Sequence, residues 1–129
     1  MKRKFVLIVL ALVLAFGAVS VVNAKTVAAT LTTNRTSNTS ATVSASADFD
    51  GIKDSCTCKI TLQEKYSGSW RTATGVPKKT ASASKSNSAG ILFSTKFTLV
   101  KGKVYRIKAK FTDTKGSRTT SATYYSGSF

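Results

Sequence analysis

Apolar and polar residues alternate along most of the chain beyond residue 25, as they do in β-strands that bury one side. The stretch VYRIKAKF, residues 104–111, shows this pattern most clearly. Its apolar side, which predicts core, comprises Tyr105, Ile107, Ala109 and Phe111. Its other side comprises Val104, Arg106, Lys108 and Lys110. Helical periodicity is missing and Ser, Thr, Val, Ile, Tyr and Phe are frequent, so the sequence predicts an all-β protein.

Turn signals divide the alternating pattern into about seven strands. Clusters of Gly, Asn, Asp and Ser, which favour turns, separate the apolar segments. The predicted strands span residues 26–32, 41–49, 56–66, 70–74, 91–99, 104–112 and 118–125. Their connections are too short for parallel crossovers, so antiparallel pairing is expected. We therefore predict a two-sheet antiparallel sandwich of immunoglobulin-like or fibronectin type III-like form.

Three local signals refine this prediction. Residues 75–90 have almost no large apolar side chains and are predicted as a flexible low-complexity loop, with at most a weak edge strand inside it. The sequence SGS at 67–69 predicts a tight hairpin turn, across which Tyr66 and Trp70 can stack. Tyr105 follows a KGK corner near the start of the penultimate strand. Immunoglobulin-like sandwiches place a tyrosine there, with its hydroxyl bonded to upstream backbone.

The first 24 residues are a predicted signal peptide. Three basic residues at 2–4 precede a long apolar run, and VNA at 22–24 presents small or short residues to a signal peptidase. We expect cleavage after Ala24 and a secreted single domain over residues 25–129. The alternative is an uncleaved membrane anchor, since about 18 apolar residues just span a bilayer. The basic start and long apolar stretch resemble signal segments of Gram-positive bacteria.

The predicted mature domain is strongly basic. Cleavage removes three of the 20 Lys and Arg residues and none of the five acids, so the formal net charge falls from +15 to +12. A charge this high on a small domain favours anionic partners and disfavours self-association. It says nothing about the fold.

A set of short motifs lies between residues 56 and 126. They are Leu62-Gln63 at a strand end, Gly68-Ser69-Trp70 at the hairpin, and Gly102-Lys103-Val104-Tyr105-Arg106 at the corner. In this pattern the chain resembles a group of small secreted β-sandwich proteins of Firmicutes, many of them from Clostridia. The motifs are structural, so the resemblance implies the fold and export and assigns no functional residue.

Cys56 and Cys58 are the two cysteines of the chain. Export would place them in an oxidising compartment. One interpretation is a local disulfide, which needs a kink or bulge because positions i and i+2 of a flat strand lie near the upper limit of the allowed Cα separation. Two buried thiols and pairing between chains are the alternatives. Two thiols without histidine do not complete a metal site, so no metal is expected.

Catalytic chemistry is not expected either. The chain has no histidine, which is the commonest general base and metal ligand near neutral pH. The acids show no catalytic spacing, and the three around one turn, Asp48, Asp50 and Asp54, lack the ligand density of a calcium loop. SASK at 82–85 matches a Ser-x-x-Lys motif by chance, because its partner motifs are missing. We expect neither enzyme activity nor a cofactor.

The best functional candidate is a basic sheet face. A sandwich of this topology places the strand 56–66 beside the strand 104–112, which in turn neighbours the last strand. The outward cations would then be Lys59, Lys65, Arg106, Lys108, Lys110 and Arg118. Six charges without an outward acid suit a linear polyanion, such as teichoic acid, anionic headgroups, acidic polysaccharide or nucleic acid. The alternative is that the lysines only keep the sheet soluble and unpaired at its edges.

These observations predict a secreted, non-enzymatic protein that associates with an anionic cell wall, membrane surface or host polymer. A specific nucleic-acid partner and a small-molecule substrate are not expected. The alternative is a cationic, bacteriocin-like antagonist that acts on the membranes of other cells.

Overall fold

The structure, a computed structural model, describes residues 26–129, so the predicted signal peptide at 1–24 lies outside the described residues. Within that range the chain forms antiparallel strands and no helix, which confirms the all-β prediction. Accordingly, none of those residues builds a helix able to span a bilayer. The strands are β1 (Thr26–Ser37), β2 (Ser40–Tyr66), β3 (Ser69–Thr72), β4 (Thr80–Thr98), β5 (Tyr105–Lys115) and β6 (Arg118–Tyr125).

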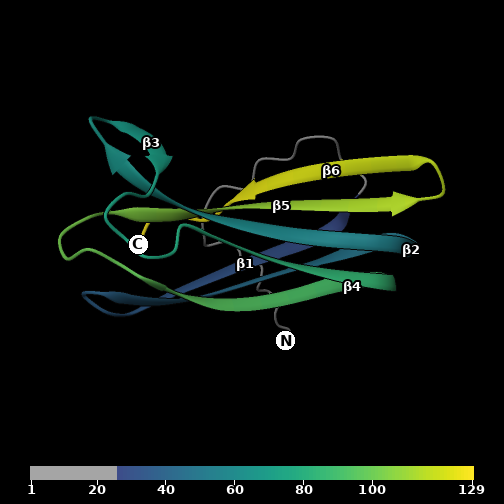
Figure 1. Cartoon of the computed structure of the whole chain (residues 1–129), viewed down its shortest axis with the longest axis horizontal. Helices are drawn as coiled ribbons and strands as arrows, with labels where there is room; N and C mark the ends of the chain where they lie inside the picture. Colours follow the sequence, from purple (N-terminus) through teal and green to yellow (C-terminus); the bar gives the residue numbers. More distant parts are fainter. Residues whose placement is uncertain (1–25) are drawn as a thin grey trace.

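The long strand β2 is the centre of one curled sheet. The strand order is β1-β2-β5-β6, and β3 and β4 also pair with β2; every pair is antiparallel. Figure 1 shows β4, β2, β5 and β6 side by side. β2 is 27 residues long, and over most of that length its backbone has partners on both sides.

The two halves of β2 have different neighbours. Residues 40–49, the first half, lie between β1 and the end of β4. Residues 53–66, the second half, lie between β5 and the start of β4, and their last four residues pair with β3. Each half therefore presents its own solvent side, although both belong to one strand.

A bend separates these halves. The register between β2 and β4 shifts between Asp48 and Lys53, and such irregularities bend a strand. At this point β4 approaches β2 so closely that a Cβ on Gly90 would lie 2.9 Å from the carbonyl oxygen of Ala47. Glycine at position 90 permits this close approach.

The buried side of the sheet is the side that the alternation predicts. Its residues include Ala41, Val43, Ala45 and Ala47 in the first half of β2, Cys56, Cys58, Ile60 and Leu62 in the second half, and Tyr105, Ile107, Ala109 and Phe111 in β5. The Tyr105 hydroxyl accepts a hydrogen bond from the backbone N of Val100 at 2.8 Å. The predicted bond between this tyrosine and upstream backbone is therefore confirmed.

The predicted number of strands is wrong by one in the described part of the chain. Segments 41–49 and 56–66 are not two strands but parts of β2, because residues 50–55 continue the extended backbone through the bend instead of forming a turn. An irregular ladder, rather than a reversal of direction, explains the polar residues at this point.

Most of the predicted flexible loop at 75–90 is strand instead, and the edge strand predicted inside it is present as the start of β4. From Thr80 onward the chain belongs to β4 and pairs with β2. Ala81 and Ala83 pack against the core, whereas Ser82 and Ser84 are exposed. The low-complexity stretch is thus an amphipathic strand whose apolar side consists of small residues.

The predicted hairpin after Tyr66 is confirmed. Ser67 and Gly68 have φ angles of 51° and 80°, and two positive values are what a two-residue type I′ turn requires. This turn places Lys65 opposite Trp70. Directly opposed residues point to the same side of a sheet, so Trp70 lies on the side of Lys65. Tyr66 follows Lys65 in the strand and therefore points to the other side. The predicted stacking of the two rings is therefore wrong.

Candidate functional site

Five of the six predicted cations lie on the solvent side of the second half of β2 and of β5. We call this surface the basic face. Its cations are Lys59, Lys65, Arg106, Lys108 and Lys110. The strand register places Lys59 directly opposite Lys110, and Gln63 opposite Arg106. Because these positions alternate with core residues, the packing of the core fixes the spacing of the charges.

Arg118 is not on the basic face, contrary to the prediction. The tight turn between β5 and β6 pairs Arg118 with Lys115, which lies on the same side of β5 as the buried Asp113. Lys110 points to the other side, because successive residues of a strand alternate. Arg118 instead lines a hollow of about 140 Å³ together with Lys53 and Asp113.

No acid among residues 26–129 forms a salt bridge with a cation of the basic face. Lys59 and Lys110 occupy directly opposed positions, which brings the Cβ atoms of such a pair to about 5 Å. Among residues 26–129 the salt bridges use Asp50, Glu64 and Asp113, and none of them involves a cation of this face. Opposed like charges destabilise a sheet. The positive charge is therefore concentrated at some cost to the fold.

Arg106 is the most constrained cation of the basic face. Its Nε donates a hydrogen bond to Gln63 Oε1 at 2.7 Å. Its guanidinium carbon lies 4.7 Å from the centre of the Trp70 ring and 4.3 Å from that of Tyr125, so one cation contacts two rings. Partial burial lowers the pKa of Arg106, and only the ionised form of the Tyr125 hydroxyl would oppose that shift. The guanidinium nevertheless stays protonated, as arginine does in proteins.

Glu64, which the sequence did not indicate as important, anchors the β3 hairpin from the buried side. Its side chain is 1% exposed. Its carboxylate accepts hydrogen bonds from Arg71 Nε (2.8 Å), Thr74 N (3.0 Å), Thr74 Oγ1 (3.0 Å) and Lys103 Nζ (3.0 Å). Burial would raise the pKa of Glu64, but these bonds outweigh burial and lower it to about 2. The sequence did contain a signal for its burial, because Glu64 follows Ile60 and Leu62 at the same two-residue spacing on the inward side of β2.

Cys56 and Cys58 are both free and buried. The predicted local disulfide is therefore absent, and the alternative of two buried thiols is the one the structure shows. Their strand keeps an unbroken register with β4 and β5 from Ser55 to Thr61, so no bulge brings the two sulfurs together. Burial raises the pKa of Cys56 and raises that of Cys58 to about 12. Buried, protonated thiols are also poorly placed for pairing with a second chain.

The acidic residues near the bend do not assemble a metal site. In the part of the chain that the structure describes, no three His, Cys, Asp or Glu side chains come together as ligands. Lys53 Nζ lies 2.6 Å from Asp50 Oδ1 and 3.6 Å from Asp113 Oδ1. Asp54 accepts a hydrogen bond from the backbone N of Gly116 at 2.7 Å. These carboxylates connect the bend to the β5–β6 hairpin.

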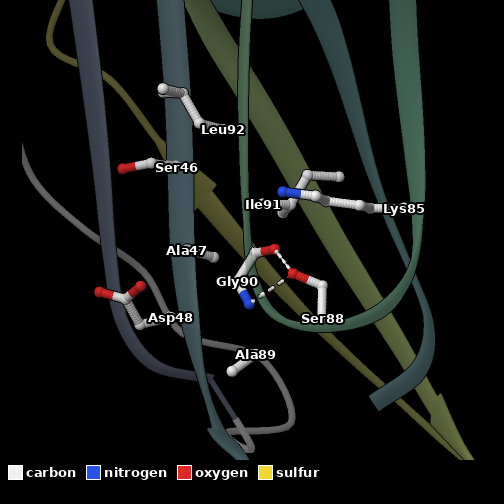
Figure 2. A pocket seen from close by; sticks show the side chains of 9 residues that line it. All are labelled: Ser46, Ala47, Asp48, Lys85, Ser88, Ala89, Gly90, Ile91 and Leu92. Carbon is white, nitrogen blue, oxygen red and sulfur yellow. Dashed lines mark hydrogen bonds between the residues drawn. The ribbon is translucent and has the colours of Figure 1, made fainter. Parts of the chain in front are cut away.

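A shallow hollow of about 430 Å³ lies beside the bend (Figure 2). In this view the Lys85 side chain extends toward the strand that carries Ile91, whereas the Asp48 carboxylate is turned away from it. The Ser88 hydroxyl donates to the Gly90 carbonyl at 2.6 Å. A ligand site needs polar groups that converge on one point, and the groups around this hollow do not.

Comparison of the chain with models of protein families and with curated proteins gives no match. The geometry and charge of the basic face are therefore the basis for a functional proposal.

Proposed function

We propose that this chain is a secreted, non-enzymatic cationic β-domain that associates with anionic polymers or surfaces of a cell wall, envelope or host through the basic face. The observation that carries the proposal is the directly opposed pair Lys59 and Lys110, with Arg106 and Lys108 on the same side and no acid among them. Solubility alone is served by interspersed charges of both signs. The opposed lysines break this pattern and add nothing to the stability of the fold, as residues at functional sites often do.

We further propose that the curled sheet is a two-layer sandwich of immunoglobulin-like or fibronectin type III-like form. β1, the first half of β2 and the end of β4 would form one layer; the start of β4, the second half of β2, β5 and β6 would form the other. The pairing of the two halves of β2 and the Tyr105 hydroxyl bond support this assignment. Membership in the small secreted Firmicutes proteins, and export through residues 1–24, belong to the same proposal.

Sedimentation with purified Gram-positive cell walls tests the binding function. Replacing Arg106, Lys108 and Lys110 by Ser should weaken binding by roughly 100-fold, because each basic side chain near an anionic surface contributes about 1 kcal/mol. A matched variant loses three exposed lysines that lie off the basic face, namely Lys79, Lys101 and Lys115. It has the same net charge and should bind almost as well as the parent protein. Equal binding by the two variants would show that net charge, not the basic face, is what matters.

A bacteriocin-like antagonist would act differently on liposomes of anionic lipid. Insertion into a membrane requires contiguous apolar surface. The exposed large apolar side chains of the described chain are scattered over different segments: Ile52, Tyr66, Leu92 and Val104. We therefore expect the protein to bind such liposomes without releasing a trapped dye. Dye release at the concentrations that give binding would favour the antagonist.

A further inference from the structure

Arg106 differs from two other arginines in the use of its terminal nitrogens. Arg35 donates both of them to backbone carbonyls, and Arg71 bonds to the carboxylate of Glu64. Arg106 is held through Nε and by two rings, but its terminal nitrogens have no hydrogen-bond partner in the described chain. A guanidinium fixed in this way presents a preformed pair of donors, which matches two oxygens of one phosphate group.

The cations of β5 continue from this point at a regular spacing. Arg106, Lys108 and Lys110 alternate with buried residues, so neighbouring cations are about 6.8 Å apart along the strand at a rise of about 3.4 Å per residue. A phosphodiester chain of a three-carbon polyol has six backbone bonds per phosphate. An extended peptide covers three bonds in about 3.5 Å, so six bonds reach about 7 Å. The two repeats match in length.

Two hydroxyl groups that have no hydrogen-bond partner within residues 26–129 flank this row of cations. Thr61 lies opposite Lys108, and Thr123 lies opposite Lys110. Neither hydroxyl bonds to another group in the described chain, unlike that of Thr112, which pairs with a serine of β6 at 3.3 Å. They are placed to bond phosphate oxygens or the hydroxyls of a polyol beside the cations.

We propose that the basic face binds a linear polyol phosphate polymer, with the terminal nitrogens of Arg106 on one phosphate and Lys108 and Lys110 on the next two. The inference rests on the proposed function and narrows its ligand from polyanions in general to phosphodiesters of an acyclic polyol. Single-stranded nucleic acid has the same bond count, but its bases need aromatic faces for stacking. The rings of Trp70 and Tyr125 already contact Arg106, which favours the polymer without bases.

The test measures binding of three polymers with the same number of charges: poly(glycerol phosphate), polyglutamate and single-stranded DNA. Arg106→Lys keeps the charge but loses the paired donors, and Arg118→Lys makes the same exchange off the basic face. We expect poly(glycerol phosphate) to bind most tightly. Arg106→Lys should lose roughly tenfold in affinity for this polymer, and Arg118→Lys at most about twofold. Thermal unfolding verifies that both variants keep the parent fold.

Failure of this inference and failure of the proposed function give different results. If the three polymers bind alike, or if Arg106→Lys binds poly(glycerol phosphate) as the parent does, the phosphate assignment is wrong and a general polyanion site is left. Tightest binding of single-stranded DNA also overturns the inference. If no polymer binds even at low salt, the proposed function itself fails.

Discussion

The two halves of β2 share one strand and one core, yet their solvent sides differ. In the first half the outward positions of β2 hold Thr42, Ser44, Ser46 and Asp48, and Ser44 Oγ lies 2.7 Å from Ser94 Oγ of β4. In the second half the corresponding kind of position holds Lys59, opposite Lys110. Lys96 of β4 is opposed by the uncharged Thr42, so the first half faces water without a pair of opposed lysines. The comparison therefore favours a role for the opposed lysines outside folding.

The two halves also differ on their buried sides. The first half ends in the apolar Ala47 and Phe49, whereas the second half contains the buried carboxylate of Glu64, which binds Arg71 and Lys103. Cations near the end of the second half are thus neutralised on the inner side and left uncompensated on the outer side. The small number of acids in the chain does not by itself explain why the outer cations lack a partner, because Glu64 is the residue next to Lys65.

Glu64→Gln should have the largest effect on stability, and it acts on the second half alone. Removing the Glu64 charge should cost about 2 kcal/mol in the free energy of unfolding at neutral pH, less than for a fully buried pair because water screens the partly exposed Arg71 and Lys103. The pKa of Glu64 is about 2 in the fold, against an ordinary value of 4.5. A lowered pKa stabilises the fold above pH 4.5, and that contribution is lost as the pH falls from 4.5 to 2. Urea unfolding at several pH values measures it.

The stability difference between the parent and Glu64→Gln should therefore shrink in acid. Asp48→Asn, which removes an exposed carboxylate from the first half, is the control and should change stability by less than about 0.5 kcal/mol. A difference for Glu64→Gln that stays constant down to acid pH would contradict the lowered pKa.

Gly90→Ala tests the bend between the halves. The new Cβ would lie 2.9 Å from the Ala47 carbonyl oxygen and 3.0 Å from Asp48 Oδ1, so β4 must move away from β2. We expect a loss of about 1–2 kcal/mol in the free energy of unfolding, since overpacking outweighs the stiffer unfolded chain. Gly51→Ala, where nothing lies within 4 Å, is the matched control. Equal thermal stability of the two variants would mean that the close approach is unimportant.

Lys110→Thr leaves Lys59 opposite a threonine, the arrangement that Lys96 and Thr42 have in the first half. Removing the charge opposite Lys59 should raise the free energy of unfolding by about 0.5 kcal/mol. Binding to anionic polymers should weaken several-fold at the same time. Lys96→Thr makes the same exchange opposite Thr42, where no cation is opposed, and should not stabilise the protein.

Denaturant unfolding at low and high salt measures both variants. The stabilisation by Lys110→Thr should disappear at high salt, because salt screens exposed charges. Lower stability of this variant at low salt would refute the claim that the opposed lysines cost the fold anything.

Alternation in the sequence was sufficient to locate most of the core, because each residue's side of a strand follows from its neighbours. Tyr105 and the other inward residues of β5 are buried as predicted. The same rule failed for Arg118. The sequence predicts a five-residue turn at 113–117, whereas β5 continues to Lys115. When the length of a turn is not known, the sequence does not tell which residues of the next strand point outward. An error of one residue in the turn moves a cation to the opposite side of the sheet.

The remaining errors concern contacts between distant segments. Ala81 and Ala83 carry too little apolar surface to predict a strand alone, and their pairing with β2 makes them one. The partners of Glu64 come from β3, from the segment after it and from the turn before β5, so its burial depends on the assembled fold. Of the candidate site, the sequence alone predicts the row along β5, but not the rings that fix Arg106.

The unbroken course of β2 has a consequence for hydrogen exchange. Residues 41–47 and 55–61 have backbone partners on both sides, so their amides are released only when neighbouring strands detach. Because β2 and β4 both run through the two halves, we expect the opening of one half to be coupled to the opening of the other. The sheet should then exchange its slowest amides through one common opening. A polymer bound to the second half should therefore slow amide exchange in the first half by the same factor.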